Sequence, residues 1–152
     1  MTNEWMPEQV SGFTSEEVSK LVQAPYILFL IFHAPTGDIL AANPLHLYET
    51  LNTHKELDNP LLSELSKMFM GNTEAVADQL FSDDFQYRDK VMEFRDIVDS
   101  NLSAEESTAF KKALSMMGRK AAELSTGGEL TEDNSNKLLS IIKEFGLVDA
   151  LI

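Results

Sequence analysis

The sequence predicts an all-α fold, a single compact bundle of about seven or eight helices that ends in a C-terminal helical hairpin. Apolar residues recur at intervals of three and four along most of the chain, which is the spacing of one helix face. Helix start signals, such as a Ser, Thr or Asn cap followed by Glu or Pro, precede these stretches. One run resembles a buried strand, but the chain has no second such run to pair with it.

The first part of the chain predicts an N-terminal arm over residues 1–12, followed by a single domain over 13–152. Thr14 and Glu17 form a capping box at the start of the first helix, which ends before Pro25 because the residue before proline avoids helical geometry. The run from Tyr26 to about His33 is apolar on every side, so we expect a helix surrounded by others in the core.

The middle of the chain contains further helix boundaries. Pro44 to about Leu51 is a predicted third helix, and Asn59 with Pro60 begins a fourth that Gly71 ends. A short helix follows from residue 73. We expect the acidic segment 82–84 to cap a further helix that carries Phe85 and continues to about residue 98.

The segment 102–147 predicts the C-terminal hairpin. Ser103 and Glu106 form a second capping box, and two glycines break the chain between two amphipathic stretches. Thr131 caps the second helix. The apolar stripe of that helix is Leu138, Leu139, Ile141, Ile142 and Phe145. Segments 37–43 and 128–134 match at a fixed offset, which indicates either a duplicated hairpin or the pattern that any two helical hairpins share.

Composition excludes several classes of function. The 152 residues carry a net charge of −13, which disfavours nucleic acid and anionic membranes as partners. There is no cysteine, so thiol nucleophiles, thiolate metal sites and disulfides are excluded. The start of the chain lacks the basic region of a secretory signal, and the longest apolar run is too short to cross a bilayer. We expect a cytoplasmic protein.

Motifs for catalysis are not apparent in the sequence. His46 and Glu49 are spaced for one helix face, but no second histidine-bearing pair completes a di-metal site. No serine lies in a Gly-x-Ser-x-Gly elbow, and no loop has the glycines and lysine of a phosphate site. We therefore predict a non-catalytic binding or scaffolding protein without a cofactor. An enzyme built from scattered Asp, Glu, His and Tyr residues is the less favoured alternative.

Four cations fall within ten residues of the long predicted helix, on what we expect to be its outer side. They are Lys111, Lys112, Arg119 and Lys120. In a chain this acidic, such a patch suits an acidic protein partner or a second copy of the chain, which makes self-association plausible. The alternative is a solvated face whose cations pair with neighbours such as Glu123.

Two resemblances accompany these patterns. The turn from Ala122 to Asp133 resembles those of the TerB-like tellurite-resistance helical domains. That similarity implies a metal-responsive or stress-resistance protein with a weak divalent cation site in its acidic turns. The acids in the two turns, after Gly37 and after Gly128, are Asp38, Glu129, Glu132 and Asp133. In the alternative, first-turn acids only complement the helix dipole. The segments 13–17, 24–25 and 144–147 also resemble an uncharacterised family of bacterial helical proteins.

Overall fold

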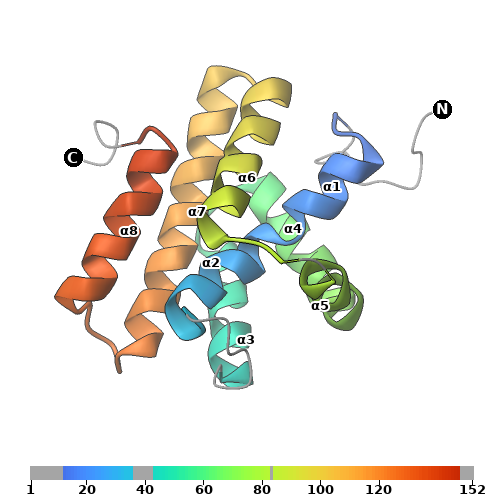
Figure 1. Cartoon of the computed structure of the whole chain (residues 1–152). Coiled ribbons are helices and arrows are strands. Elements are labelled where there is room, and N and C mark those ends of the chain that lie inside the picture. The colour runs from blue at the N-terminus through green and yellow to red at the C-terminus, as the bar shows by residue number, and fades with distance from the viewer. Residues whose placement is uncertain (1–11, 36–42, 83, 148–152) are drawn as a thin grey trace.

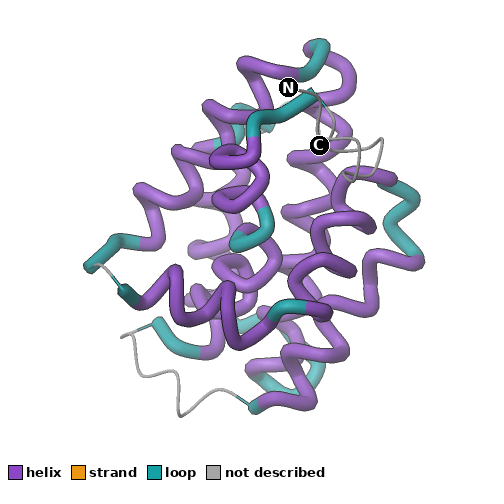
Figure 2. Tube along the Cα trace, turned by 90° about the vertical axis from the view of Figure 1, so that its right-hand side faces the viewer, coloured by secondary structure: helices purple, strands orange, loops and turns teal. Residues whose placement is uncertain are grey.

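Helices make up most of the computed structural model, which describes residues 12–35, 43–82 and 84–147. The α-helices are α1 (Ser15–Leu21), α2 (Ala24–His33), α3 (Pro44–Asn52), α4 (Pro60–Gly71), α5 (Thr73–Phe81), α6 (Tyr87–Asn101), α7 (Ala104–Ser125) and α8 (Glu132–Glu144). A single 3₁₀ turn, η3 (Thr53–Lys55), follows α3. The described ranges contain no strand, so the predicted all-α fold is confirmed (Figure 2).

The centre of the bundle is α2, as its apolar composition predicts. It packs against α3, α4, α6 and α7, and residues 24–30 and Phe32 are buried. Its most extensive contact is with α7, where Gly118 lies beside Leu28. Because neighbouring helices cover most of α2, it needs no polar side (Figure 1). In the part of the chain that the structure describes, no helix combines the length and apolar character needed to cross a membrane.

The C-terminal hairpin of α7 and α8 is confirmed, and α7 is the longest described helix (Figure 1). Gly127 and Gly128 have φ of 80° and 118°, which reverses the chain at low steric cost. The Asn134 side chain donates to the Ala122 carbonyl at 3.3 Å and to the Ser125 hydroxyl at 2.8 Å, tying the start of α8 to the end of α7. Residues 36–42 lie outside the described ranges, so the duplicated hairpin stays a prediction.

Most predicted helix starts are present. The Thr14–Glu17 and Ser103–Glu106 capping boxes both form, and Asn59 and Thr131 cap α4 and α8. The predicted acidic cap over residues 82–84 is wrong, because α6 begins only at Tyr87 and its N-cap side chain makes no capping bond.

Phe85 lies just before α6, and its ring contacts two other aromatic rings. Its centroid lies 5.9 Å from that of Phe81 and 5.7 Å from that of Tyr87. Aromatic contacts of this kind contribute about 0.5–1.5 kcal/mol beyond apolar burial, comparable to a helix cap. The contact with Phe81, across the turn, therefore competes with an earlier start to α6.

The predicted apolar stripe of α8 is wrong at one position. Leu138 and Ile141 are buried, whereas Leu139 is 43 % exposed. Adjacent residues on a helix point about 100° apart, so a narrow contact with α7 buries only one of the two leucines. Leu45 and Tyr48 on α3 are likewise exposed.

Candidate functional site

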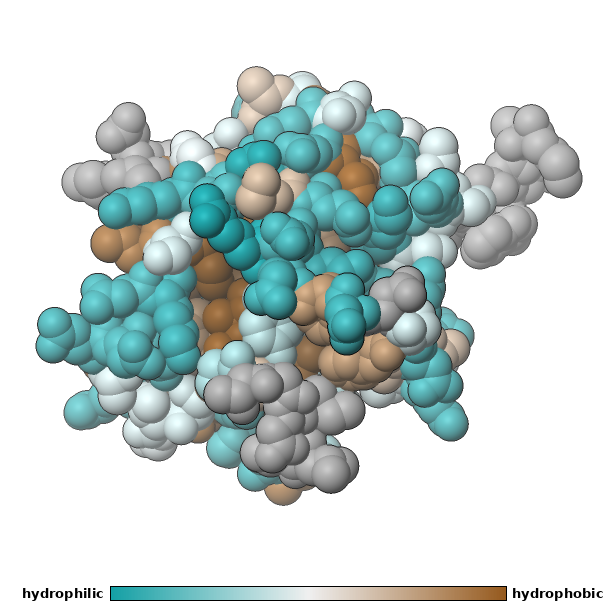
Figure 3. Space-filling model, in the orientation of Figure 1, coloured by the Kyte–Doolittle hydropathy of each residue, from teal (hydrophilic) through white to brown (hydrophobic). Residues whose placement is uncertain are grey.

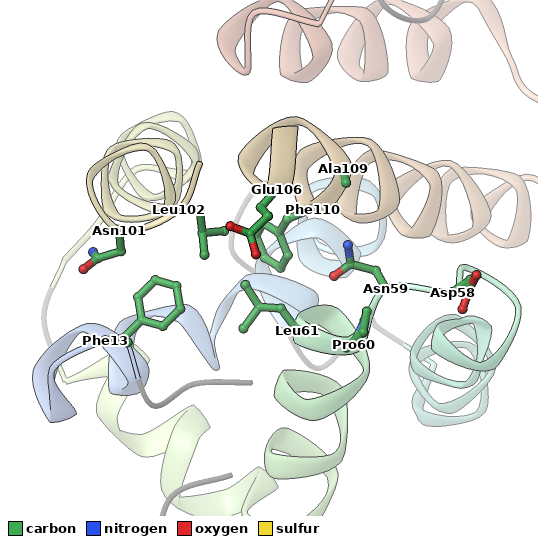
Figure 4. Close-up of a pocket in the computed structure, with 11 residues that line it drawn as sticks. Phe13, Asp58, Asn59, Pro60, Leu61, Asn101, Leu102, Glu106, Ala109 and Phe110 are labelled. Atoms are coloured by element: carbon green, nitrogen blue, oxygen red, sulfur yellow. The ribbon is translucent and has the colours of Figure 1, made fainter. Parts of the chain in front are cut away.

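A cavity of about 730 Å³ opens where the ends of four helices meet, at the starts of α1, α4 and α7 and the end of α6 (Figure 4). Figure 4 shows the side chains of Phe13, Leu61 and Leu102 pointing into the same space, with Phe110 also lining it. Phe13, Leu61 and Phe110 form the apolar floor of this cavity, and each is at most 9 % exposed. We call this the first cavity.

The rim of the first cavity is polar because it consists of helix caps. The Asn59 side chain accepts from the Leu62 amide at 3.0 Å, and Glu106 accepts from the Ser103 amide at 3.3 Å. Asn101, at the end of α6, donates to a Glu17 carboxylate oxygen at 3.0 Å. The residues that begin and end these helices therefore also supply hydrogen-bonding groups around an apolar floor.

A second cavity of about 450 Å³ adjoins the first across a ridge formed by Asp58, Asn59 and Pro60, which line both. The residues that it adds are His54, Lys55, Ser63 and Lys67. Two lysines flank this cavity, whereas the carboxylate of Glu106 lines the other. The sign of the local charge therefore changes across the ridge.

The ridge itself has an unusual backbone conformation. Asp58 has φ of 48°, which among the described residues other than glycine is the only positive value. Aspartate tolerates this left-handed region better than most residues because its short polar side chain bonds locally. The reversal at Asp58 joins η3 to α4 and separates the two cavities.

His54 and Ser63 form the nearest approach to a catalytic pair in this site. The Ser63 hydroxyl lies 2.9 Å from His54 Nδ1. Burial lowers the pKa of His54, and the charges of Lys67 and Lys55 lower it further, so the imidazole is neutral near pH 7. A serine nucleophile also needs an acid to orient its histidine, and none of the described carboxylates hydrogen-bonds to His54. The sequence carried no motif for this pair because the two residues meet only across the turn at Asp58.

A second histidine whose pKa is lowered is the partly buried His33 at the end of α2. His33 Nε2 donates to the Ala121 carbonyl at 2.7 Å, and its ring stacks on Phe29 at a centroid distance of 4.2 Å. Burial lowers the pKa of His33, the bond to Ala121 opposes this in part, and nearby His46 lowers the pKa again. His33 therefore serves as the polar end of α2, joined to α7.

The lowered pKa values of His33 and His54 predict that the free energy of unfolding falls in mild acid. Because their pKa values are lower in the folded state than in the unfolded chain, protons bind preferentially to the unfolded chain once the pH falls below about 6.5. As the pH falls, each histidine then lowers the free energy of unfolding by at most about 1.4 kcal/mol per pH unit. Urea denaturation between pH 8 and 5 should show the free energy of unfolding falling, and a His33→Gln, His54→Gln variant should show a shallower fall. Equal slopes in the two proteins would contradict this assignment.

Among the described residues, the acids predicted to bind metal do not form a cluster. Asp38 lies outside the described residues, and Glu129, Glu132 and Asp133 are exposed around the start of α8. Asp133 pairs with Lys137 at 3.4 Å. Within the described ranges, no three His, Asp or Glu side chains converge in a way that could hold a metal ion. Glu132 and Asp133 occupy the first turn of α8, where they complement the helix dipole.

The predicted basic patch needs correction at one residue. Lys111 is only 7 % exposed, and its ammonium group hydrogen-bonds to Asp99 on α6. Residues 111 and 120 are nine positions apart, which places them on opposite sides of a helix. Lys111 therefore faces inward, and Lys112, Arg119 and Lys120 remain as candidates for partner binding, with Arg119 4.0 Å from Glu123.

The two sequence resemblances rest on local features. Helix caps and glycine turns stabilise helix ends in many unrelated folds, so their presence here does not distinguish one family from another. Membership of the bacterial helical family and similarity to TerB-like domains stay predictions. Comparison of the chain with family models, curated proteins and solved structures finds no match.

Proposed function

We propose that this protein is a non-catalytic helical binding protein that holds a segment of a partner protein at the start of α4. The observation that carries the proposal is the first cavity, an apolar floor ringed by amides and carboxylates (Figure 4). Sites that bind a partner commonly pair an apolar pocket for one anchoring side chain with a few polar groups that orient it.

Charge defines the kind of segment that fits. Glu106 lines only the first cavity, Lys55 and Lys67 line only the second, and Asp58 on the ridge lines both. A segment that crosses the ridge would place an apolar anchor on the floor, a basic residue beside Glu106 and an acidic residue beside the lysines. Complementary charge of this kind fixes the direction of a bound chain more than it adds affinity.

The hydrogen bonds of the ionisable groups at the two cavities support a binding role rather than a catalytic one. Glu106 already accepts hydrogen bonds within its capping box, and the Ser63–His54 pair has no acid bonded to the imidazole among the described residues. The anchoring floor itself carries no ionisable side chain, since it consists of Phe13, Leu61, Leu102 and Phe110.

A peptide selection tests the proposal with a defined probe. A phage-displayed library of random twelve-residue peptides would be selected against the folded protein, and enriched peptides would be titrated by amide NMR. We expect shifts at Phe13, Leu61 and Phe110. Ala109→Arg places a long side chain at the rim without removing a core group, because Ala109 is exposed on α7 and lines the cavity. It should weaken binding by about tenfold, equivalent to about 1.4 kcal/mol.

The matched control is Ala75→Arg, which makes the same change at an exposed position of α5 outside both cavities. Peptide affinity should be unchanged in this variant. The proposal fails if no peptide is enriched, if the shifts cluster on other helices, or if the two arginine variants bind equally well.

A further inference from the structure

A groove between α6 and α8, separate from the site at α4, has a different chemistry. Its volume is about 420 Å³ and its apolar floor is formed by Ile31 of α2, Val91 of α6 and Ile141 of α8. Tyr87 also lines the groove, and its hydroxyl donates to the Ala34 carbonyl at 2.6 Å. Figure 3 shows apolar surface exposed along a strip bordered on both sides by hydrophilic residues. We call this the α6–α8 groove.

The rim of the α6–α8 groove is cationic in a chain whose net charge is −13. Arg88, Lys137 and Lys143 line it against one carboxylate, Glu144. That carboxylate is already engaged, because Arg95 contacts it at 3.3 Å and Arg88 at 3.8 Å. The partner of Lys137 is Asp133, whose side chain is 79 % exposed and lies outside the groove lining.

Lys143 has no ion-pair partner among the described residues. Among the described residues, no carboxylate therefore competes with a ligand for its ammonium group. The groove lining thus carries a net positive charge although the chain as a whole is acidic, and this charge lies directly beside an apolar floor. This combination matches a molecule with an apolar body and one anionic end, since the body displaces water from the floor while the charge meets the rim.

We propose that the α6–α8 groove binds a medium-chain carboxylate, with its alkyl chain on Ile31, Val91 and Ile141 and its carboxylate between Lys137 and Lys143. A monoanion suits the groove better than a dianion such as a phosphate monoester. Glu144 at the rim and the field of the whole chain both repel additional negative charge. This site is independent of the proposed partner site, because no residue lines both.

The test uses sodium decanoate below its micelle-forming concentration, titrated into protein with labelled Ile and Val methyl groups. Saturable shifts are expected at Ile31, Val91 and Ile141. Decanol has the same apolar body without the charge, and acetate has the charge without the apolar body. The affinity of each should be at least about tenfold lower than that of decanoate.

Two variants with the same change in total charge separate the local rim from the field of the whole chain. Lys137→Gln with Lys143→Gln should weaken decanoate binding by about tenfold, equivalent to about 1.4 kcal/mol. The matched control is Lys112→Gln with Lys120→Gln on α7, which should leave the affinity unchanged. The proposal is overturned if the shifts are unsaturable or lie on other methyl groups, if decanol binds as tightly as decanoate, or if both double variants weaken binding equally.

Discussion

Replacing Gly118 by valine is expected to lower the free energy of unfolding by about 3 kcal/mol, because the added atoms overpack the contact between α2 and α7. A Cβ at this position would lie 2.8 Å from Leu28 Cδ1 and 3.7 Å from Phe32 Cε2. Leu28 is fully buried, so its side chain has little room to turn away. Glycine at this position therefore lets α2 and α7 approach each other closely. Urea denaturation of the variant would measure the loss.

A double-mutant cycle would show that this loss comes from the contact with Leu28. Leu28→Ala alone should cost about 2–5 kcal/mol, but the double variant should cost at least about 1 kcal/mol less than the sum of the single changes. Gly71→Val is the matched control, since a Cβ there meets nothing within 4 Å. An additive cycle, or an equal cost at the two glycines, would rule out the close approach of α2 and α7.

Asp99→Ala is expected to destabilise the protein by about 2–3 kcal/mol, whereas Lys111→Met should change stability by less than about 1 kcal/mol. Removing Asp99 leaves the buried ammonium group of Lys111 without its counter-charge, since the lysine side chain is only 8 % exposed. Removing the lysine instead leaves Asp99 48 % exposed to water. That exposure also keeps the cost of Asp99→Ala below the value for a fully buried pair.

The pKa of Asp99 gives an independent check of this pair. Burial raises the pKa, but the hydrogen bonds from Lys111 and Ser107 outweigh it, so the pKa lies below its usual range. Lys111→Met should therefore raise the pKa of Asp99, which carboxyl-detected NMR would measure. The control is Asp96→Ala, which removes an exposed acid from its pair with Arg95 and should cost less than about 1 kcal/mol. A larger loss from Lys111→Met than from Asp99→Ala would contradict the asymmetry.

Local signals in the sequence were enough for most helix boundaries. The capping boxes Thr14–Glu17 and Ser103–Glu106 each join residues three positions apart, so they form wherever the chain adopts a helical turn. The central position of α2 followed from its apolar composition, because such a helix is stable only when surrounded. The start of α6 was mispredicted where aromatic contacts made by Phe85 competed with a local cap.

The candidate sites depended on contacts between distant parts of the chain. Lys111 faces α6 rather than solvent because Asp99 lies opposite it, and no spacing rule within α7 contains that information. The two cavities and the α6–α8 groove arise where helix ends and faces from separate segments meet. The sequence alone therefore determined which segments are helical, since caps and apolar periodicity act within a few residues. The tertiary structure decided which side chains line a site, because packing sets the direction in which each helix face points.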